Sequence, residues 1–353
     1  MIKIPFCSLD HASTWFLKPK TQNWSGFMKS CLQGTHPGKA NVVFLPFIDL
    51  SASYPTCIYS TLKFISSLSE KHQFHPVITF DQPLYWKAMK IVKSNRNQDI
   101  SRIIVKLGGF HTMMSFIGSI GHIMDGSGLQ EVLEQIYASD SVVHMLSGKA
   151  IARAIRGLFI VECALYYILL KEIVNESQHG VRGVQPDLTI SQEERRQLLK
   201  LVDNVTTIED FPVNEVVKDS SFKKLQTVLS LKIDKLSQSK TAKLWIQLLE
   251  MISLLKLFIR ADRTSDWVLH LQTISDMLPF FAASGHNNYT KSLMVYHQDM
   301  SSLEEQHPSL YRSYMKGEHT IRRSDNPFWG GLPADLVIEQ DLMRSMKSNC
   351  MNL

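Results

Sequence analysis

Two short apolar runs, each followed by polar residues and a helical pattern, constrain the fold most. The first run covers residues 76–81 and ends at Asp81, and the second covers residues 102–107 and is followed by Gly108-Gly109-Phe110-His111. A connection of helix length between two such runs predicts neighbouring parallel strands. Groups at the carboxyl ends of parallel neighbours converge on one crevice. We therefore expect Asp81 and His111 to lie close together.

The predicted fold class is α/β, with a small parallel sheet and a large all-helical region. A third strand is expected over residues 42–49, interrupted by Pro46, and a helix follows from Pro55 to about Lys71. Residues 112–317 show repeated helical spacing and capping patterns such as Ser191-Gln-Glu-Glu194, so we expect them to be almost entirely helical.

These patterns predict four parts. Residues 1–40 form an irregular arm, residues 41–125 an α/β body, residues 126–317 a helical region, and residues 318–353 a closing strand and helix that return to the body.

Composition limits the class of protein only broadly. A net charge of +5 permits an anionic partner without requiring one. The five cysteines are scattered and form no C-x-x-C pair, which favours a reducing, intracellular compartment over a disulfide framework. The most apolar run, residues 157–170, is too short to span a membrane and contains Glu162, so we expect no membrane partner.

Three carboxylates are candidates for a metal site. Asp49 and Asp81 follow apolar strand patterns, and Glu339 interrupts an apolar helix pattern near the end of the chain. Carboxylates that meet at one crevice can hold Mg²⁺ ions for phosphoryl transfer. The alternative is that each one caps a helix or ends a strand. Asp81, directly before Gln82-Pro83, has the sequence of a helix N-cap.

His111 and Gly109 are candidates for positioning a ligand. A histidine in this position can act as a base, a metal ligand or a phosphate contact, or it can be a hydrogen-bonded residue at the start of a helix. The two glycines predict a tight turn that a ligand can approach. The chain has no G-x-G-x-x-G or Walker sequence, so the pattern does not favour a nucleotide-binding Rossmann or P-loop fold.

Four basic residues near the C-terminal end are candidates for binding nucleic acid: Arg322, Arg323, Arg344 and Lys347. Arginine side chains with a nearby aromatic residue suit a phosphate backbone and unstacked bases. The alternative is a solvated turn in which the arginines pair with Asp325 or Asp335.

Several motifs resemble a family of multicopy animal proteins of unknown function whose genomic abundance is that of mobile elements. The motifs are Trp24-Ser-Gly-Phe27, Ile78 to Ala88, Leu107 to His111, Ser127-Gly-Leu129 and Asp335 to Gln340. More distantly, the chain is similar to a fungal family of unknown function. The shared features there are Asp81-Gln82, the Gly-x-Phe-His turn, Asn288-Tyr289, and Glu339 before Lys347.

The order of these elements also resembles transposases with an RNase H-like core. That resemblance implies Mg²⁺-dependent cleavage of DNA, with Asp81 and Glu339 as the second and third acids and Asp49 or Asp10 as the first. It further implies a nuclear location and an approach of the Asp81 and Glu339 carboxyls to within about 8 Å. It leaves open whether the chain is an active enzyme, an inactive fragment, or a non-catalytic remnant that binds nucleic acid or protein. The sequence does not indicate an oligomeric state.

Overall fold

The computed structural model describes residues 38–43, 48, 50–95, 99–179, 189–207, 213–322 and 330–343. The chain divides into two compact units. One contains residues 120–256, and the other contains residues 35–119 and 257–353. The chain passes from one unit to the other within helices α5 and α12, which cover Gly109–Ile123 and Lys240–Thr264.

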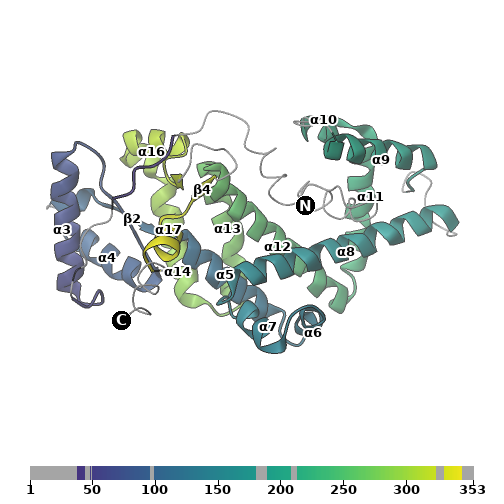
Figure 1. Cartoon of the computed structure of the whole chain (residues 1–353), viewed down its shortest axis with the longest axis horizontal. Coiled ribbons are helices and arrows are strands. Elements are labelled where there is room, and N and C mark those ends of the chain that lie inside the picture. Colours follow the sequence, from purple (N-terminus) through teal and green to yellow (C-terminus); the bar gives the residue numbers. More distant parts are fainter. Residues whose placement is uncertain are drawn as a thin grey trace. The chain divides into compact units, whose positions relative to one another are not determined.

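The parallel strand pair lies in the second unit (Figure 1). Strand β1, Val77–Phe80, pairs in parallel with β2, Ile104–Leu107, and Thr79 lies opposite Lys106. Helix α4, Gln82–Ser94, connects the two strands and contacts both. This arrangement confirms the predicted parallel pairing, and its physical basis is the helix-length crossover.

The expected strand over residues 42–49 is not seen in the described part of that range. Residues 42, 43 and 48 have no strand conformation, and residues 44–47 and 49 lie outside the described residues. Val43 is 72% exposed, so its apolar side chain does not face the core. Ala40 instead donates a backbone hydrogen bond of 2.7 Å to the carbonyl of Arg322.

Further elements of the second unit surround the strand pair. They are α3 (Pro55–Lys71), a 3₁₀ turn (Asp99–Arg102), α13 (Trp267–Ala283), α14 (Asn287–Ser301), α15 (Leu303–Gln306), α16 (Pro308–Met315), and α17 (Ala334–Val337) followed by a π-helical turn (Ile338–Met343). A short antiparallel pair, β3 (Ile321–Arg322) with β4 (Gly331–Leu332), confirms the strand predicted near residue 320.

The helical region predicted for residues 126–317 does not form one unit. Its last part, residues 257–317, packs with the strand pair, because α14 contacts both α4 and β2. The buried rings of Tyr85 on α4 and Tyr296 on α14 meet edge to face with centroids 6.4 Å apart. Helical spacing shows that a helix has an apolar face but does not show which element covers that face.

The described residues of the first unit form helices and the turns between them. Its helices are α6 (Leu129–Glu134), α7 (Ser139–Leu146), α8 (Ile151–His179), α9 (Gln192–Thr207), α10 (Val213–Lys218), α11 (Ser220–Leu236) and most of α12. A core cluster that includes Tyr166, Leu229 and Leu249 joins α8, α11 and α12. The predicted capping box opens α9, because Ser191 N–H donates to Glu194 and Glu194 N–H donates to the Ser191 hydroxyl.

Candidate functional site: the carboxyl end of the strand pair

Asp81 ends β1 and caps helix α4. Its Oδ1 accepts a hydrogen bond of 3.2 Å from Leu84 N–H, as an N-cap residue does. The capping interpretation of this residue is therefore confirmed. The second oxygen, Oδ2, makes no hydrogen bond with the described residues, so the cap does not use the whole carboxylate.

His111 lies in the first turn of α5, directly after β2, and Asp335 holds it there. The buried Asp335 carboxylate accepts hydrogen bonds from Phe110 N–H at 3.1 Å and from His111 N–H at 3.0 Å. It also lies 3.0 Å from Nδ1 of the His111 ring. One side chain thus satisfies two of the unpaired N–H groups at the helix start and fixes the orientation of the imidazole.

Gly108 makes this close approach feasible. A Cβ atom at position 108 would lie 2.3 Å from Oδ2 of Asp335, which is far inside contact distance. At Gly109, a Cβ atom would lie 3.1 Å from the Pro333 side chain and 3.4 Å from Oδ2 of Asp262. The sequence suggested that a ligand can approach this glycine pair. In the structure, carboxylates of the chain itself, Asp335 and Asp262, occupy that space.

The charges around His111 come from two separate parts of the sequence. The hydrogen bond that Asp335 accepts from the His111 ring is the main cause that raises the pKa of His111. Burial lowers this pKa, and the charges of Asp335, Asp81 and Glu339 raise it further. Asp81, His111 and Glu339 therefore share one electrostatic neighbourhood. Glu339 is exposed, and His111 retains 29% side-chain exposure. The expected distance of about 8 Å between the Asp81 and Glu339 carboxyls stays a prediction.

Tyr289, on α14, belongs to the same neighbourhood. Burial raises its pKa most, and the negative charges of Asp81 and Asp335 raise that pKa further. Its ring stacks on Phe281 with centroids 5.8 Å apart, and Gln82 donates a 3.0 Å hydrogen bond to Ser292 one turn further along α14. Asp335 and Tyr289 were not among the site residues predicted from the sequence. Both residues lie far from His111 in the chain. In the sequence they stand out only because they belong to motifs shared with families of unknown function.

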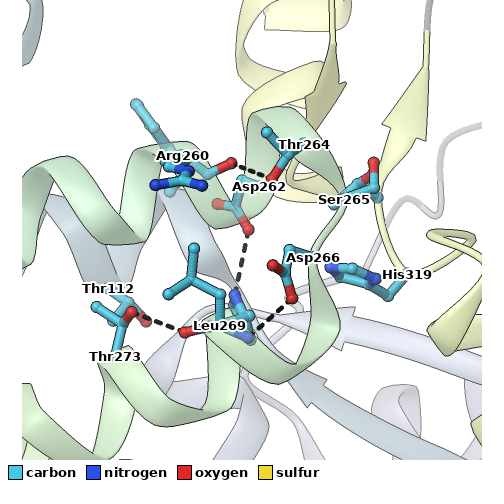
Figure 2. A network of polar contacts seen from close by, with 12 residues as sticks. Thr112, Arg260, Asp262, Thr264, Ser265, Asp266, Leu269, Thr273 and His319 are labelled. Atoms are coloured by element: carbon cyan, nitrogen blue, oxygen red, sulfur yellow. Dashed lines mark hydrogen bonds and ion pairs between the residues drawn. The ribbon is translucent and has the colours of Figure 1, made fainter. Parts of the chain in front are cut away.

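A second carboxylate–histidine pair lies at the junction of α12 and α13 (Figure 2). Oδ1 of Asp262 is 3.2 Å from Nδ1 of His270, and both residues are buried. The His270 ring stacks on Trp267, and its Nε2 lies 3.4 Å from the Tyr296 hydroxyl. Asp266 caps α13 by accepting from Leu269 N–H at 3.0 Å. Neither member of the Asp262–His270 pair is accessible, so we assign this pair a structural role beneath the site.

The basic candidates do not form a patch in the described residues. Arg322 lies in β3 with 2% exposure, so its guanidinium is not presented to a polynucleotide on the surface. Arg323, Arg344 and Lys347 lie outside the described residues, as do Asp49 and Asp10.

A metal site formed by the protein alone is not found among the described residues, where no group of three or more His, Cys, Asp or Glu side chains is arranged to hold an ion. Asp335 is fully engaged with N–H donors, so Asp81 and Glu339 are the carboxylates around His111 that remain available. Mg²⁺ is often held by one or two carboxylates together with substrate phosphates, and only that mode fits this donor set.

Fold and site together define a mostly helical protein with a parallel strand pair and an acid–histidine cluster at its carboxyl end. The chain belongs to the family described as "Domain of unknown function (DUF8702)", whose model matches residues 23–350. No curated protein and no solved structure matches the chain. In the part of the chain that the structure describes, no helix has both the length and the apolar character needed to cross a membrane.

Proposed function

We propose that this chain derives from a transposable element and acts on nucleic acid at the carboxyl end of its strand pair, with His111 as the acid–base group. The observation that carries the proposal is the anchoring of His111 by Asp335 within the field of Asp81 and Glu339. The order of the acids along the chain, with Asp81 after a strand and Glu339 in a late helix, resembles that of RNase H-like transposases and supports the same function.

The chemistry available to His111 depends on which of its two ring nitrogens donates to Asp335. A carboxylate only accepts hydrogen bonds, so His111 donates to Asp335 through Nδ1. In the neutral imidazole, Nε2 then carries the lone pair and can take a proton. Because its pKa is raised, His111 holds its proton to a higher pH than an unperturbed histidine does. Such a group can activate a water molecule or protonate a leaving oxygen of a phosphodiester.

Asp81 and Glu339 have a separate role in this proposal. Their carboxylates would hold Mg²⁺ together with phosphate oxygens of the substrate, and the ion would stabilise the charge that develops on the phosphorus oxygens. Asp335 positions His111 and does not contact the substrate.

The test is a cleavage assay with supercoiled plasmid and with labelled single- and double-stranded DNA and RNA, in Mg²⁺, in Mn²⁺ and in EDTA. We expect metal-dependent nicking by the full chain, and a loss of about a hundredfold or more in His111→Gln, since acid–base groups typically contribute about 10²–10⁴-fold. The matched control is His122→Gln, an exposed histidine on the same helix. For the acid, Glu339→Gln is compared with Glu305→Gln, which is also exposed.

The second candidate function is a non-catalytic nucleic-acid-binding remnant. Two observations favour it: Asp81 serves as a helix cap, and the described residues supply no complete set of metal ligands. In that case the chain binds DNA with an affinity that falls steeply with salt, and no variant at His111 or Glu339 changes a cleavage rate. Arg323→Ala is the informative basic variant, because Arg322→Ala would also remove a buried side chain.

A further inference from the structure

A cleft of about 920 Å³ lies on one face of the strand pair, within the second unit. It runs between the C-terminal end of α3 and helix α16. Its lining includes Val77, Thr79 and Lys106 from the strands, His75 from the turn before β1, and Tyr314 from α16. The proposed strand-end residues Asp81, His111 and Glu339 do not line it. Its volume lies within the range of small-molecule sites, about 300–1,000 Å³.

Lys106, a partly buried residue of β2, lines this cleft. Its Nζ donates to the His319 carbonyl at 2.8 Å and lies over the Tyr314 ring, 5.2 Å from the centroid. Within the described residues, no carboxylate lies close enough to Lys106 to form an ion pair. Burial lowers the pKa of Lys106 to about 8, although the charges of Asp262 and Asp335 act in the opposite direction.

An ammonium group has three N–H donors, and the structure shows one of them in use. Keeping such a charge out of water without a counter-ion is costly. An anion bound in the cleft would supply that counter-ion, and Lys106 is therefore the group around which we expect a ligand to bind.

Two further polar groups of the lining make no hydrogen bond with any described residue. The Tyr314 hydroxyl is buried and makes no hydrogen bond with the described residues, and Tyr314 itself is only 3% exposed. Nε2 of His75 is likewise buried and without a hydrogen bond in the described part of the chain. Buried polar groups are almost always hydrogen-bonded, so orphans that line one cleft indicate a missing partner.

The other charged residues of the lining are exposed to solvent, so they should attract an anion less strongly than Lys106 does. Arg102 pairs with Glu70 at 3.2 Å, and both side chains are about half exposed. Glu318 is exposed at the margin. These groups are solvated and screened, whereas Lys106 is held against aromatic rings where electrostatic interactions are stronger.

We propose that the cleft binds a small anionic molecule, whose phosphate or carboxylate group pairs with Lys106 and accepts a hydrogen bond from Tyr314. Phe74, which lines the cleft and is 52% exposed, offers an apolar surface for a flat ring attached to that group. This site is separate from the one formed by Asp81, His111 and Glu339, and the proposal does not depend on the function proposed for those residues.

The experiment measures binding to the full chain by isothermal titration calorimetry and by ligand-observed NMR. The probes are adenosine monophosphate, adenosine, inorganic phosphate and benzoate. We expect saturable binding of at least one anionic ring compound and none of adenosine, which lacks the charge. A preference for the nucleotide over benzoate identifies a phosphate ligand, and the reverse preference identifies a carboxylate.

Lys106→Met keeps the length of the side chain and removes its charge, and should weaken binding at least about tenfold, as expected for loss of a charged hydrogen bond. The matched control is Lys63→Met, an exposed lysine over the Tyr59 ring at 5.9 Å, which should bind like the wild type. If Lys106→Met does not fold, Tyr314→Phe is the test variant. It removes only the hydroxyl oxygen proposed to contact the ligand, and should weaken binding. The proposal is overturned if no anionic probe binds to the folded wild type, or if Lys106→Met and Tyr314→Phe both bind it unchanged.

Discussion

The Asp335 carboxylate connects α17 to the start of α5. It accepts from Phe110 N–H, from His111 N–H and from the His111 ring at distances of 3.0–3.1 Å. Each buried donor that loses such a partner costs about 1–3 kcal/mol. The position of His111, and with it the chemistry of the site, therefore depends on a residue 224 positions away.

The first prediction concerns the titration of His111. Replacing Asp335 by Asn removes the main cause of the raised pKa, so the pKa of His111 should fall towards or below its ordinary value. Asp81→Asn, which retains a capping side chain, removes only a more distant charge and should lower the pKa less. Histidine C–H resonances followed by NMR against pH give both values. An equal shift in the two variants would contradict the assignment of Asp335 as the dominant partner.

The second prediction concerns Gly331 in β4. A Cβ atom at this position would lie 2.2 Å from the Thr320 hydroxyl and 2.4 Å from the backbone carbonyl of Asp262. Because a backbone atom cannot rotate away, Gly331→Ala should destabilise the protein by at least the 1–3 kcal/mol typical of overpacking, to order of magnitude. Gly126→Ala is the control, since it meets nothing within 4 Å and carries only the strain of a positive φ of 66°. Urea denaturation should show a larger loss for Gly331→Ala, and the opposite order would refute the packing argument.

At the scale of elements, several helices begin at a capping side chain next to them in sequence, whereas helix packing depends on side chains far apart in the chain. Asp81, Asp219 and Asp266 each cap the helix that follows. By contrast, α8 and α12 share an ion pair between Glu162 and Lys256, both almost fully buried, with the ammonium 4.7 Å from the Phe159 ring centroid.

The third prediction tests that buried pair. Glu162→Gln leaves the Lys256 charge without its carboxylate and should cost about 3–5 kcal/mol of unfolding free energy. Replacing both residues by Met removes the uncompensated charge and should recover much of that loss. The exposed pair Arg196–Glu193 is the control, because Glu193→Gln should change stability by less than about 1 kcal/mol. A double variant as unstable as the single one would mean that the pair is not the source of the effect.

At the scale of the whole molecule, we expect stability to depend on pH through histidines whose pKa values are shifted in opposite directions. Burial lowers the pKa values of His75 and His307, and lowers that of His319 well below the ordinary value. In these three the folded state binds protons less readily than the unfolded state, so stability is lost as pH falls below about 6.5. His111 acts in the opposite direction. Its contribution is fully present below about 6.5 and is lost as pH rises through its raised folded pKa.

The fourth prediction follows from that balance. Because the pKa of His319 lies well below its ordinary value and those of His75 and His307 are lowered too, we expect the unfolding free energy to be smaller at pH 5.5 than at pH 7.5. The double variant His75→Gln/His307→Gln removes a contacting pair of rings and should depend less on pH than the wild type. Urea titrations at the two pH values measure the difference. Equal or greater stability of the wild type at the lower pH would show that these histidines do not control acid unfolding.

Most of the local architecture could be predicted from the sequence. The alternation of apolar strands and helix-length connections located β1, α4 and β2, and it predicted their parallel pairing. The Ser-x-x-Glu pattern located the start of α9, and Asp81 before Gln82-Pro83 located the start of α4. These features depend on neighbours in the chain, where spacing and residue type carry the information.

The sequence by itself determined the strand pair, the helix caps, and the position of Asp81 and His111 at the end of neighbouring strands, because each depends on periodicity or on adjacent residues. Only the tertiary structure decided that Asp335 holds His111, that Arg322 is buried, and that Lys106 lies in a cleft beside Tyr314. Lys106 and the His319 carbonyl are 213 positions apart, and no local pattern specifies such a contact. It arises when helices pack to bury their apolar faces, and that packing places a few polar groups together.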